Sequence, residues 1–301
     1  MVARAREELL AGSHRYAISA TVKALVWVAV ACGAVLVLSL WTFWMAVRPP
    51  RLTIPGAPQD YRLTAEDLTL TTADGVKLAA WLITVGAPGA PAIVVLHGYP
   101  ANKADLLPIA GALHSRFTVL LLDFRSFGTS EGRVTTLGFR ERADLRAAVD
   151  ALAQRGHTRI GVFGYSLGGA VALLGAAEDP RIRAVAAWAP FADLRMLARD
   201  LYASFWVLKY PFVELMVLWG RLFLGGDITR PSPEMAAARL TVPVQVWASR
   251  NDDQIPFAHA ERLRQALRNN ARAEFHFGHG LHNERAADFE RRLIEFFARA
   301  L

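Results

Sequence analysis

Short apolar runs alternate with longer amphipathic segments from residue 68 to the end of the chain. Continuous apolar runs are typical of strands buried on both faces, and the segments between them show helical periodicity. This alternation predicts a mostly parallel central sheet with helices on both faces. Ligand sites of such sheets lie beyond the carboxyl ends of the strands, so reactive groups are sought there. The expected strands are 68–72 and 77–84 (a hairpin), 92–96, 118–122, 159–163, 183–188, 243–248 and 273–277, and the expected helices are 103–115, 138–155, 167–178, 257–269 and 283–300.

An uncharged apolar segment from Ala24 to Val47 precedes this region. As a helix it would reach roughly 36 Å, enough to cross a hydrocarbon core of about 30 Å. Trp27 near one end and Trp41 near the other suit the two membrane interfaces. A cleavable signal peptide has a shorter apolar region followed by small residues, whereas Trp, Phe and Met fill the end of this one. The segment therefore predicts one transmembrane helix.

Basic residues flank this segment on both sides. They are Arg4, Arg6, Arg15 and Lys23 before it, and Arg48, Arg51 and Arg62 after it. The positive-inside rule favours a cytoplasmic N-terminus, by a margin of one residue. We expect a single-pass membrane protein with a short basic segment at 1–23, a transmembrane helix at 24–47, a Pro- and Gly-rich linker at 48–67 and an extracytoplasmic domain at 68–301.

Residues 191–240 interrupt the alternation of strands and helices. The middle of this stretch is strongly apolar, which raises the alternative of a second transmembrane span. However, Arg199, Asp200 and Lys209 interrupt it, and Pro211 breaks a helix there. We expect an inserted helical cap over the site, with an apolar surface that is compatible with a membrane.

The segment Gly164-Tyr165-Ser166-Leu167-Gly168 lies between an expected strand and an expected helix. A nucleophile on such a tight turn has a strained backbone, so its neighbours must lack bulk, and glycines provide that room. The helix N-terminus then favours negative charge near the serine oxygen. Ser166 is the candidate nucleophile.

A serine hydroxyl needs a general base, and histidines gather late in the chain. His282 follows the strand 273–277, at the sheet edge where a base is needed, and His279 is the alternative. His276 lies inside the strand and is interpreted as a packed residue. His97, after the strand 92–96, is interpreted as a structural residue of its loop.

Asp252 and Asp253 follow the strand 243–248 and are the candidate acids that would orient the base. Their place between Ser166 and His282 gives the chain order Ser…Asp…His. The spacing to Ile255-Pro256 favours Asp252 and leaves Asp253 as a solvated or capping carboxylate. Asp193 is a more distant candidate, interpreted as a helix cap.

Acyl transfer also needs amide donors for the oxyanion that develops on the carbonyl oxygen. One is expected to be the N–H of Leu167, directly after the candidate nucleophile. The other is expected to be the N–H of Tyr99, because Gly98 lets the backbone turn sharply after the strand 92–96.

Together these residues resemble the α/β-hydrolase superfamily, and more narrowly its serine-aminopeptidase-like and lysophospholipase-like branch. The resemblance covers about Leu68 to Phe297 and rests on HGYPANKADLL, LLDFRSFGTSEG, GFRERADLRAAVDAL, GYSLGGAVAL, PSPEMAAARLTVPVQVWASRNDDQIP and GLHNE. It implies an α/β-hydrolase fold with nucleophile, acid and base at Ser166, Asp252 and His282, and oxyanion amides at Tyr99 and Leu167. It also implies supporting roles for Asp123, Arg125, Gly128 and Ser130. The chain has Ser126 where the family often has Gly or Ala, and Ser249 in place of a common Gly.

The sequence therefore predicts a serine hydrolase that cleaves a small-molecule acyl ester or lipid through an acyl-enzyme. Amide or peptide hydrolysis with the same residues is one alternative, and a non-enzymatic membrane scaffold of the same fold is another. No metal or cofactor is expected, and the one cysteine, Cys32, lies in the apolar segment. The net charge of +7 comes without runs of basic residues interleaved with aromatic ones, which argues against a nucleic-acid partner.

Overall fold

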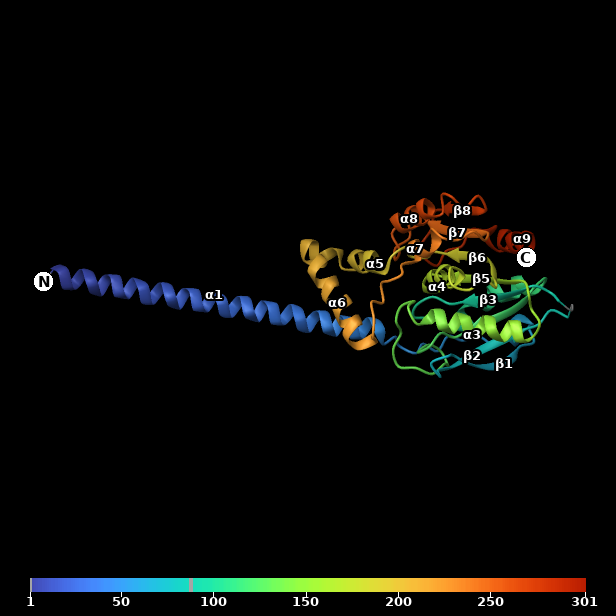
Figure 1. The fold of residues 1–301 in the computed structure, drawn as a ribbon, viewed down its shortest axis with the longest axis horizontal. Coiled ribbons are helices and arrows are strands. Elements are labelled where there is room, and N and C mark those ends of the chain that lie inside the picture. The colour runs from blue at the N-terminus through green and yellow to red at the C-terminus, as the bar shows by residue number, and fades with distance from the viewer. Residues whose placement is uncertain (1, 87–88) are drawn as a thin grey trace.

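A single sheet forms the centre of the molecule (Figure 1). The computed structural model describes residues 2–86 and 89–301, with side chains described from residue 21 onward. The strands follow the spatial order β1-β2-β4-β3-β5-β6-β7-β8. They are β1 (Glu66–Thr71), β2 (Lys77–Ile83), β3 (Ala92–Leu96), β4 (Thr118–Leu122), β5 (Ile160–Tyr165), β6 (Ile182–Trp188), β7 (Val244–Ser249) and β8 (Ala273–Gly278). Strands β3 to β8 pair in parallel, and only the β1–β2 and β2–β4 pairs of this sheet are antiparallel, so the predicted mostly parallel sheet is confirmed.

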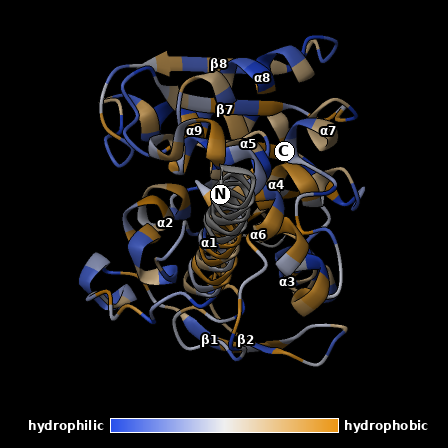
Figure 2. Cartoon of the chain, turned by 90° about the vertical axis from the view of Figure 1, so that its left-hand side faces the viewer, coloured by the Kyte–Doolittle hydropathy of each residue, from blue (hydrophilic) through white to orange (hydrophobic). Residues whose placement is uncertain are grey.

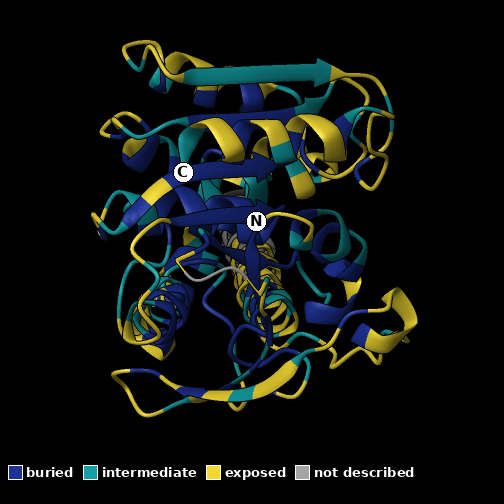
Figure 3. Cartoon of the chain, turned by 90° about the vertical axis from the view of Figure 1, so that its right-hand side faces the viewer, coloured by how far each residue is buried: buried dark blue, intermediate teal, exposed yellow. Residues whose placement is uncertain are grey.

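Helices cover both faces of the sheet (Figure 2). Side chains of α2 (Leu107–His114) and α9 (Phe289–Ala300) pack on one face, and those of α3 (Glu141–Gln154), α4 (Leu167–Ala176) and α8 (Ala258–Ala266) pack on the other. Val162 and Phe163, adjacent in β5, are both fully buried but lie in opposite layers. This is the alternation expected of neighbouring strand residues. The inner strands are buried whereas β1 is largely exposed (Figure 3).

Two expected helices differ most from their predicted bounds. The range 103–115 divides into a 3₁₀ turn, η2 (Lys103–Leu106), and α2. The last helix begins at Phe289 rather than at 283, because residues 281–284 form a turn. The Glu284 carboxylate accepts the Leu281 N–H, and the Leu281 carbonyl accepts the Glu284 N–H, so the local hydrogen bonds favour a loop there.

A helical insertion lies between β6 and β7, as predicted. It consists of α5 (Leu194–Leu201), the 3₁₀ segment η3 (Ala203–Leu208) and α6 (Lys209–Leu224). Asp193 caps α5 by accepting the Met196 N–H at 2.8 Å, which fits its interpretation as a helix cap. The short helix α7 (Pro233–Ala237) returns the chain to the core, where Ala236 and Ala237 are buried. We call α5, η3 and α6 the cap.

The N-terminal helix α1 (Val2–Val47) leaves the body of the protein on one side (Figure 1). It begins well before the apolar segment, so the helix continues through the basic residues that precede it. Its part from Thr21 to Val47 has a mean hydropathy of 2.4 and is long and apolar enough to cross a membrane. After α1, the linker holds a 3₁₀ turn, η1 (Pro58–Tyr61), and leads into β1.

Arg51 binds the linker to the domain. Arg51 donates hydrogen bonds to the carbonyls of Gly128 and Ser130, each at 2.7 Å, and to that of Gly132 at 3.0 Å. Bonds to a charged donor are stronger than neutral ones. This segment is therefore more than a flexible tether.

Candidate active site

Ser166 lies on a strained turn between β5 and α4, with φ 51° and ψ −113°. Glycines make this turn sterically feasible. A Cβ on Gly164 would lie 2.1 Å from the Gly168 carbonyl oxygen, and a Cβ on Gly168 would lie 2.2 Å from the carbonyl oxygen of Leu96. Both glycines of the predicted motif are thus required by close backbone approach, and the turn holds Ser166 at the carboxyl edge of the sheet.

The loop after β3 lies directly against this serine. A Cβ on Gly98 would lie 3.2 Å from the Ser166 Cβ, which places the next peptide beside the hydroxyl. In the part of the chain that the structure describes, neither the Tyr99 N–H nor the Leu167 N–H donates a hydrogen bond to the protein. Two free amide donors next to a serine suit an oxyanion.

His282 and Asp252 are joined by a hydrogen bond of 2.7 Å between Nδ1 and Oδ2, and both side chains are 3% exposed. Burial opposes the charge of Asp252. The His282 hydrogen bond and the N–H groups of Ile255 and Gln254 outweigh it and lower the pKa of the Asp252 carboxyl. A carboxylate held ionised in this way fixes the ring so that Nε2 is left for another partner.

Ser166 and this pair are brought to the same edge of the sheet without a direct bond. Across the described residues, the Ser166 hydroxyl and His282 Nε2 make no hydrogen bond. Tyr165, the neighbour of Ser166, lies against the His282 ring with ring centroids 5.1 Å apart. Its hydroxyl donates to Asn283 Oδ1, so the loop that carries the histidine is held beside the serine turn.

Asp253, expected to be a solvated or capping carboxylate, is exposed and binds a backbone N–H group. It is not merely solvated, because its Oδ1 accepts the His282 N–H at 3.0 Å. Asp252 therefore holds the ring and Asp253 holds the backbone of the same residue. Ser249 adds a third tie, since its hydroxyl donates to the Gly280 carbonyl and joins the loop after β7 to the loop after β8.

The other histidines lie in different surroundings. His279 is exposed and its Nδ1 lies 2.7 Å from Asn251 Oδ1. His276 stacks on Trp247 with centroids 4.1 Å apart, as expected of a packed strand residue. His97 is fully buried, with Nδ1 2.8 Å from the Gly98 carbonyl and Nε2 accepting the Phe124 N–H at 3.1 Å. Burial lowers the pKa of His97, so the ring is neutral and braces the loop that carries Tyr99.

A buried ion pair supports the same loop; a supporting role was expected of Asp123, but its partner Lys103 was not expected from the sequence. Lys103 Nζ lies 2.6 Å from Asp123 Oδ2, and the Lys103 N–H donates to Oδ1 of the same carboxylate at 2.7 Å. A Cβ on Gly128, which has φ +49°, would lie 2.2 Å from that carboxylate. Ser130 donates to the Asp123 carbonyl at 2.7 Å. The available signal was that both charged residues follow neighbouring strands, β3 and β4.

The remaining member of this stretch, Arg125, lies between two carboxylates. Its Nε donates to Asp144 Oδ1 at 2.8 Å and its Nη1 to Asp74 Oδ2 at 2.7 Å. Ser126, where the resembling family often has Gly or Ala, has a left-handed φ of 71°. That backbone conformation explains why a small residue is common there.

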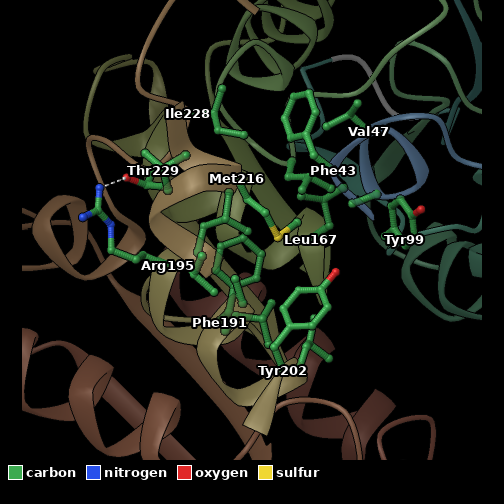
Figure 4. A pocket seen from close by; sticks show the side chains of 18 of the residues that line it. Phe43, Val47, Tyr99, Leu167, Phe191, Arg195, Tyr202, Met216, Ile228 and Thr229 are labelled. Atoms are coloured by element: carbon green, nitrogen blue, oxygen red, sulfur yellow. Dashed lines mark hydrogen bonds between the residues drawn. The ribbon is translucent and has the colours of Figure 1, made fainter. Parts of the chain in front are cut away.

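A largely apolar cavity of about 350 Å³ opens beside Ser166 (Figure 4). The cap forms one part of its wall, with Tyr202 and Met216 directed inward, and the domain contributes Leu167 and Phe191. Volumes of this size are typical of small-molecule sites. The sequence did not indicate that Phe43 and Val47 of α1 line the same cavity.

Comparisons with known proteins agree with this architecture. The model of the Alpha/beta hydrolase family matches residues 93–292. A Mycobacterium tuberculosis protein described as uncharacterised is 34% identical over 203 residues, and the match spans 65% of this chain and 65% of that protein. The Arabidopsis thaliana alpha/beta hydrolase domain-containing protein WAV2 is 28% identical over 257 residues, which are 76% of this chain and 78% of that protein.

Solved structures show the same fold. The Pyrococcus furiosus esterase Pf2001 has a TM-score of 0.71 and 26% sequence identity, over 84% of this chain and 99% of that chain. A puromycin-hydrolyzing peptidase of Mycobacterium tuberculosis has a TM-score of 0.64 at 20% identity, over 83% of this chain and 41% of that chain, and shows likeness of fold alone. Since the family model covers about two thirds of the 301 residues, the chain belongs to the alpha/beta hydrolase family.

Proposed function

We propose that the protein is a serine hydrolase that cleaves an acyl ester through an acyl-enzyme at Ser166. The observation that carries this proposal is the 2.7 Å bond between His282 and Asp252 beside a serine on a strained turn. The two free amides of Tyr99 and Leu167 support it further. Likeness to an esterase at 26% identity favours ester chemistry.

In the first half of the reaction, Ser166 Oγ attacks the ester carbonyl carbon and His282 Nε2 takes the hydroxyl proton. The Tyr99 and Leu167 N–H groups stabilise the oxyanion. Collapse of the tetrahedral intermediate breaks the bond to the leaving oxygen, which takes the proton from His282 and departs as an alcohol. A hydrogen bond between the Ser166 hydroxyl and His282 Nε2 is expected to form only with substrate bound.

In the second half, water attacks the acyl-enzyme and gives its proton to His282. The second tetrahedral intermediate releases a carboxylic acid and returns the proton to Ser166. Asp252 stays ionised throughout and stabilises the imidazolium. No step needs a group from outside the chain other than substrate and water.

The apolar lining of the cavity favours an acyl group over a polar one. This suits the lysophospholipase-like branch that the motifs resemble. We further propose that α1 anchors the protein as a single span, with the domain on the extracytoplasmic side. Paired ester and amide substrates with the same acyl group would separate ester from amide or peptide hydrolysis, and no hydrolysis of either would favour a scaffold.

Variants of the acid and the nucleophile test the mechanism. With p-nitrophenyl butyrate, Ser166→Ala should lose essentially all enzymatic hydrolysis. Asp252→Asn should lower kcat by a factor on the order of 10⁴, because the ring loses its orienting charge. Asp253→Asn is the matched control, since an amide oxygen still accepts the His282 N–H, and its kcat should stay within about tenfold of wild type. A larger loss in Asp253→Asn than in Asp252→Asn would reverse the assignment of the acid.

A further inference from the structure

The membrane helix takes part in the substrate cavity. Phe43, Ala46 and Val47 of α1 line it together with Ser166, although more than 100 residues separate them in the sequence. We propose that the last turns of α1 form a wall of the acyl-binding site and that the substrate is a long-chain lipid ester that reaches Ser166 from the bilayer. This inference rests on the proposed function of Ser166.

α1 and the cap pack against each other through buried side chains and a hydrogen bond. Phe43 and Val47 are 2% and 0% exposed and pack with Leu224 of α6. Trp219 of α6 donates its indole N–H to the Ser39 hydroxyl at 3.0 Å. Ser39, Phe43 and Val47 recur every four residues, so they form one stripe along the helix. The stripe fixes α1 against the cap and thereby fixes this wall of the cavity.

The length of α1 fits a helix that does both tasks. Its apolar part has 27 residues, whereas about 20 are enough to cross a bilayer. This surplus leaves room for the turns at Ser39–Val47 that meet the cap. The cap consequently lies at the membrane surface and not away from it.

An exposed apolar residue of the cap also lines the cavity. Leu201 lines the cavity and is also 65% exposed, which marks an opening at the cap edge. Beyond it, Trp206 and Leu208 of η3 are 79% and 63% exposed. Figure 1 shows that the end of the cap between α5 and α6 points to the same side of the molecule as α1. Exposed apolar side chains at that end, beside a helix long enough to cross a membrane, mark a lipid-facing surface. An acyl chain can move along this surface without crossing water.

Substitutions in α1 test the wall directly. The full-length protein is reconstituted in phosphatidylcholine vesicles, and kcat/KM is compared for p-nitrophenyl palmitate and p-nitrophenyl butyrate. Ala46→Phe adds bulk to the wall and should lower the palmitate-to-butyrate ratio by about tenfold or more, because one methylene more or less in a hydrophobic pocket changes kcat/KM by roughly 10–200-fold. Val47→Ala enlarges the cavity and should raise the ratio. Ala34→Phe is the matched control, since Ala34 is exposed on the same helix, and its ratio should stay at the wild-type value.

A small fluorophosphonate probe separates the two proposals. No labelling of the wild type at Ser166 would overturn the proposed function itself. If Ala46→Phe is labelled at the wild-type rate and its palmitate-to-butyrate ratio is unchanged, the proposal that α1 forms a wall of the acyl-binding site is wrong. If Ala46→Phe is not labelled because it does not fold, the palmitate-to-butyrate ratio of Val47→Ala is the test. An unchanged ratio in Val47→Ala also contradicts the proposed wall.

The route from the bilayer has its own readout. At constant bulk concentration, dilution of the palmitate ester in the vesicles with inert phosphatidylcholine should lower the wild-type rate in step with the surface mole fraction of the ester. A rate that depends on bulk concentration alone would contradict entry from the bilayer.

Discussion

At the scale of single residues, a buried neutral histidine makes the loop that carries Tyr99 sensitive to acid. Protonated His97 would direct an N–H at the Phe124 N–H, where Nε2 now accepts. Burial places the folded-state pKa of His97 below its ordinary value of 6.5. The unfolded chain therefore binds a proton below about pH 6.5 that the folded protein does not, and stability is lost as pH falls below that value.

Thermal unfolding midpoints between pH 7 and pH 5 check this expectation. The unfolding midpoint of the wild type should fall over this interval. In His97→Gln the residue at position 97 does not titrate, so the midpoint should fall less steeply. The difference in slope should correspond to about one proton bound on unfolding. His279→Gln controls for the loss of one histidine at the surface. An equal change of slope in both variants would contradict the role of His97.

The sequence alone does not decide which of the adjacent carboxylates, Asp252 or Asp253, contacts the His282 ring. The pattern of strands placed both Asp252 and Asp253 at the sheet edge, but only side-chain directions decide which one meets the ring. Periodicity does not define those directions in a loop. Spacing to Ile255-Pro256 favoured Asp252, and the geometry places that carboxylate on the ring.

At the scale of elements, the turn from β5 to α4 depends on backbone packing that tolerates no side chain. Gly168→Ala would push a Cβ to 2.2 Å from the Leu96 carbonyl oxygen. We expect it to lower the free energy of unfolding by about 3 kcal/mol and to displace the Ser166 turn.

Gly111→Ala in α2 is the matched control for that variant. A Cβ on Gly111 meets nothing within 4 Å, so alanine should raise the stability by about 0.5–1 kcal/mol through its higher helix propensity. Chemical denaturation in detergent measures both variants. A neutral Gly168→Ala would contradict the steric reading of the turn.

Helices, strands and turns that show a local sequence pattern could be predicted, whereas contacts between elements far apart in the sequence could not. The parallel strands and the turn at Ser166 show in local apolarity and in glycine placement. In contrast, Arg51 binds carbonyls 77 or more residues away, and Trp219 meets Ser39 across 180 positions. Such pairs arise only once the chain has folded, so a single sequence holds no local trace of them.

At the scale of the whole molecule, α1, the linker and the domain form one assembly. Arg51 is engaged with the loop at 128–132, and Arg48 lies over the Trp44 ring at 4.4 Å, so two of the three arginines after the span have protein partners. We propose that the N-terminus is the cytoplasmic end, because more basic residues precede the apolar segment than follow it.

A topology reporter tests that orientation. A reporter enzyme that is active only outside the cytoplasm, fused after Leu301 of the full chain, should be active in cells. The same fusion to a reporter that is active only inside the cytoplasm is the control and should be silent. The opposite pair of results would place the domain in the cytoplasm.

The chemical identity of the labelled residue is the most direct test of the mechanism. The full-length protein is treated with a fluorophosphonate in detergent, digested, and the adduct is located by mass spectrometry. We predict one adduct, on Ser166, which is lost in Ser166→Ala and greatly slowed in His282→Ala. An adduct on any other residue, or undiminished labelling of Ser166→Ala, would contradict the assignment of Ser166 as the nucleophile.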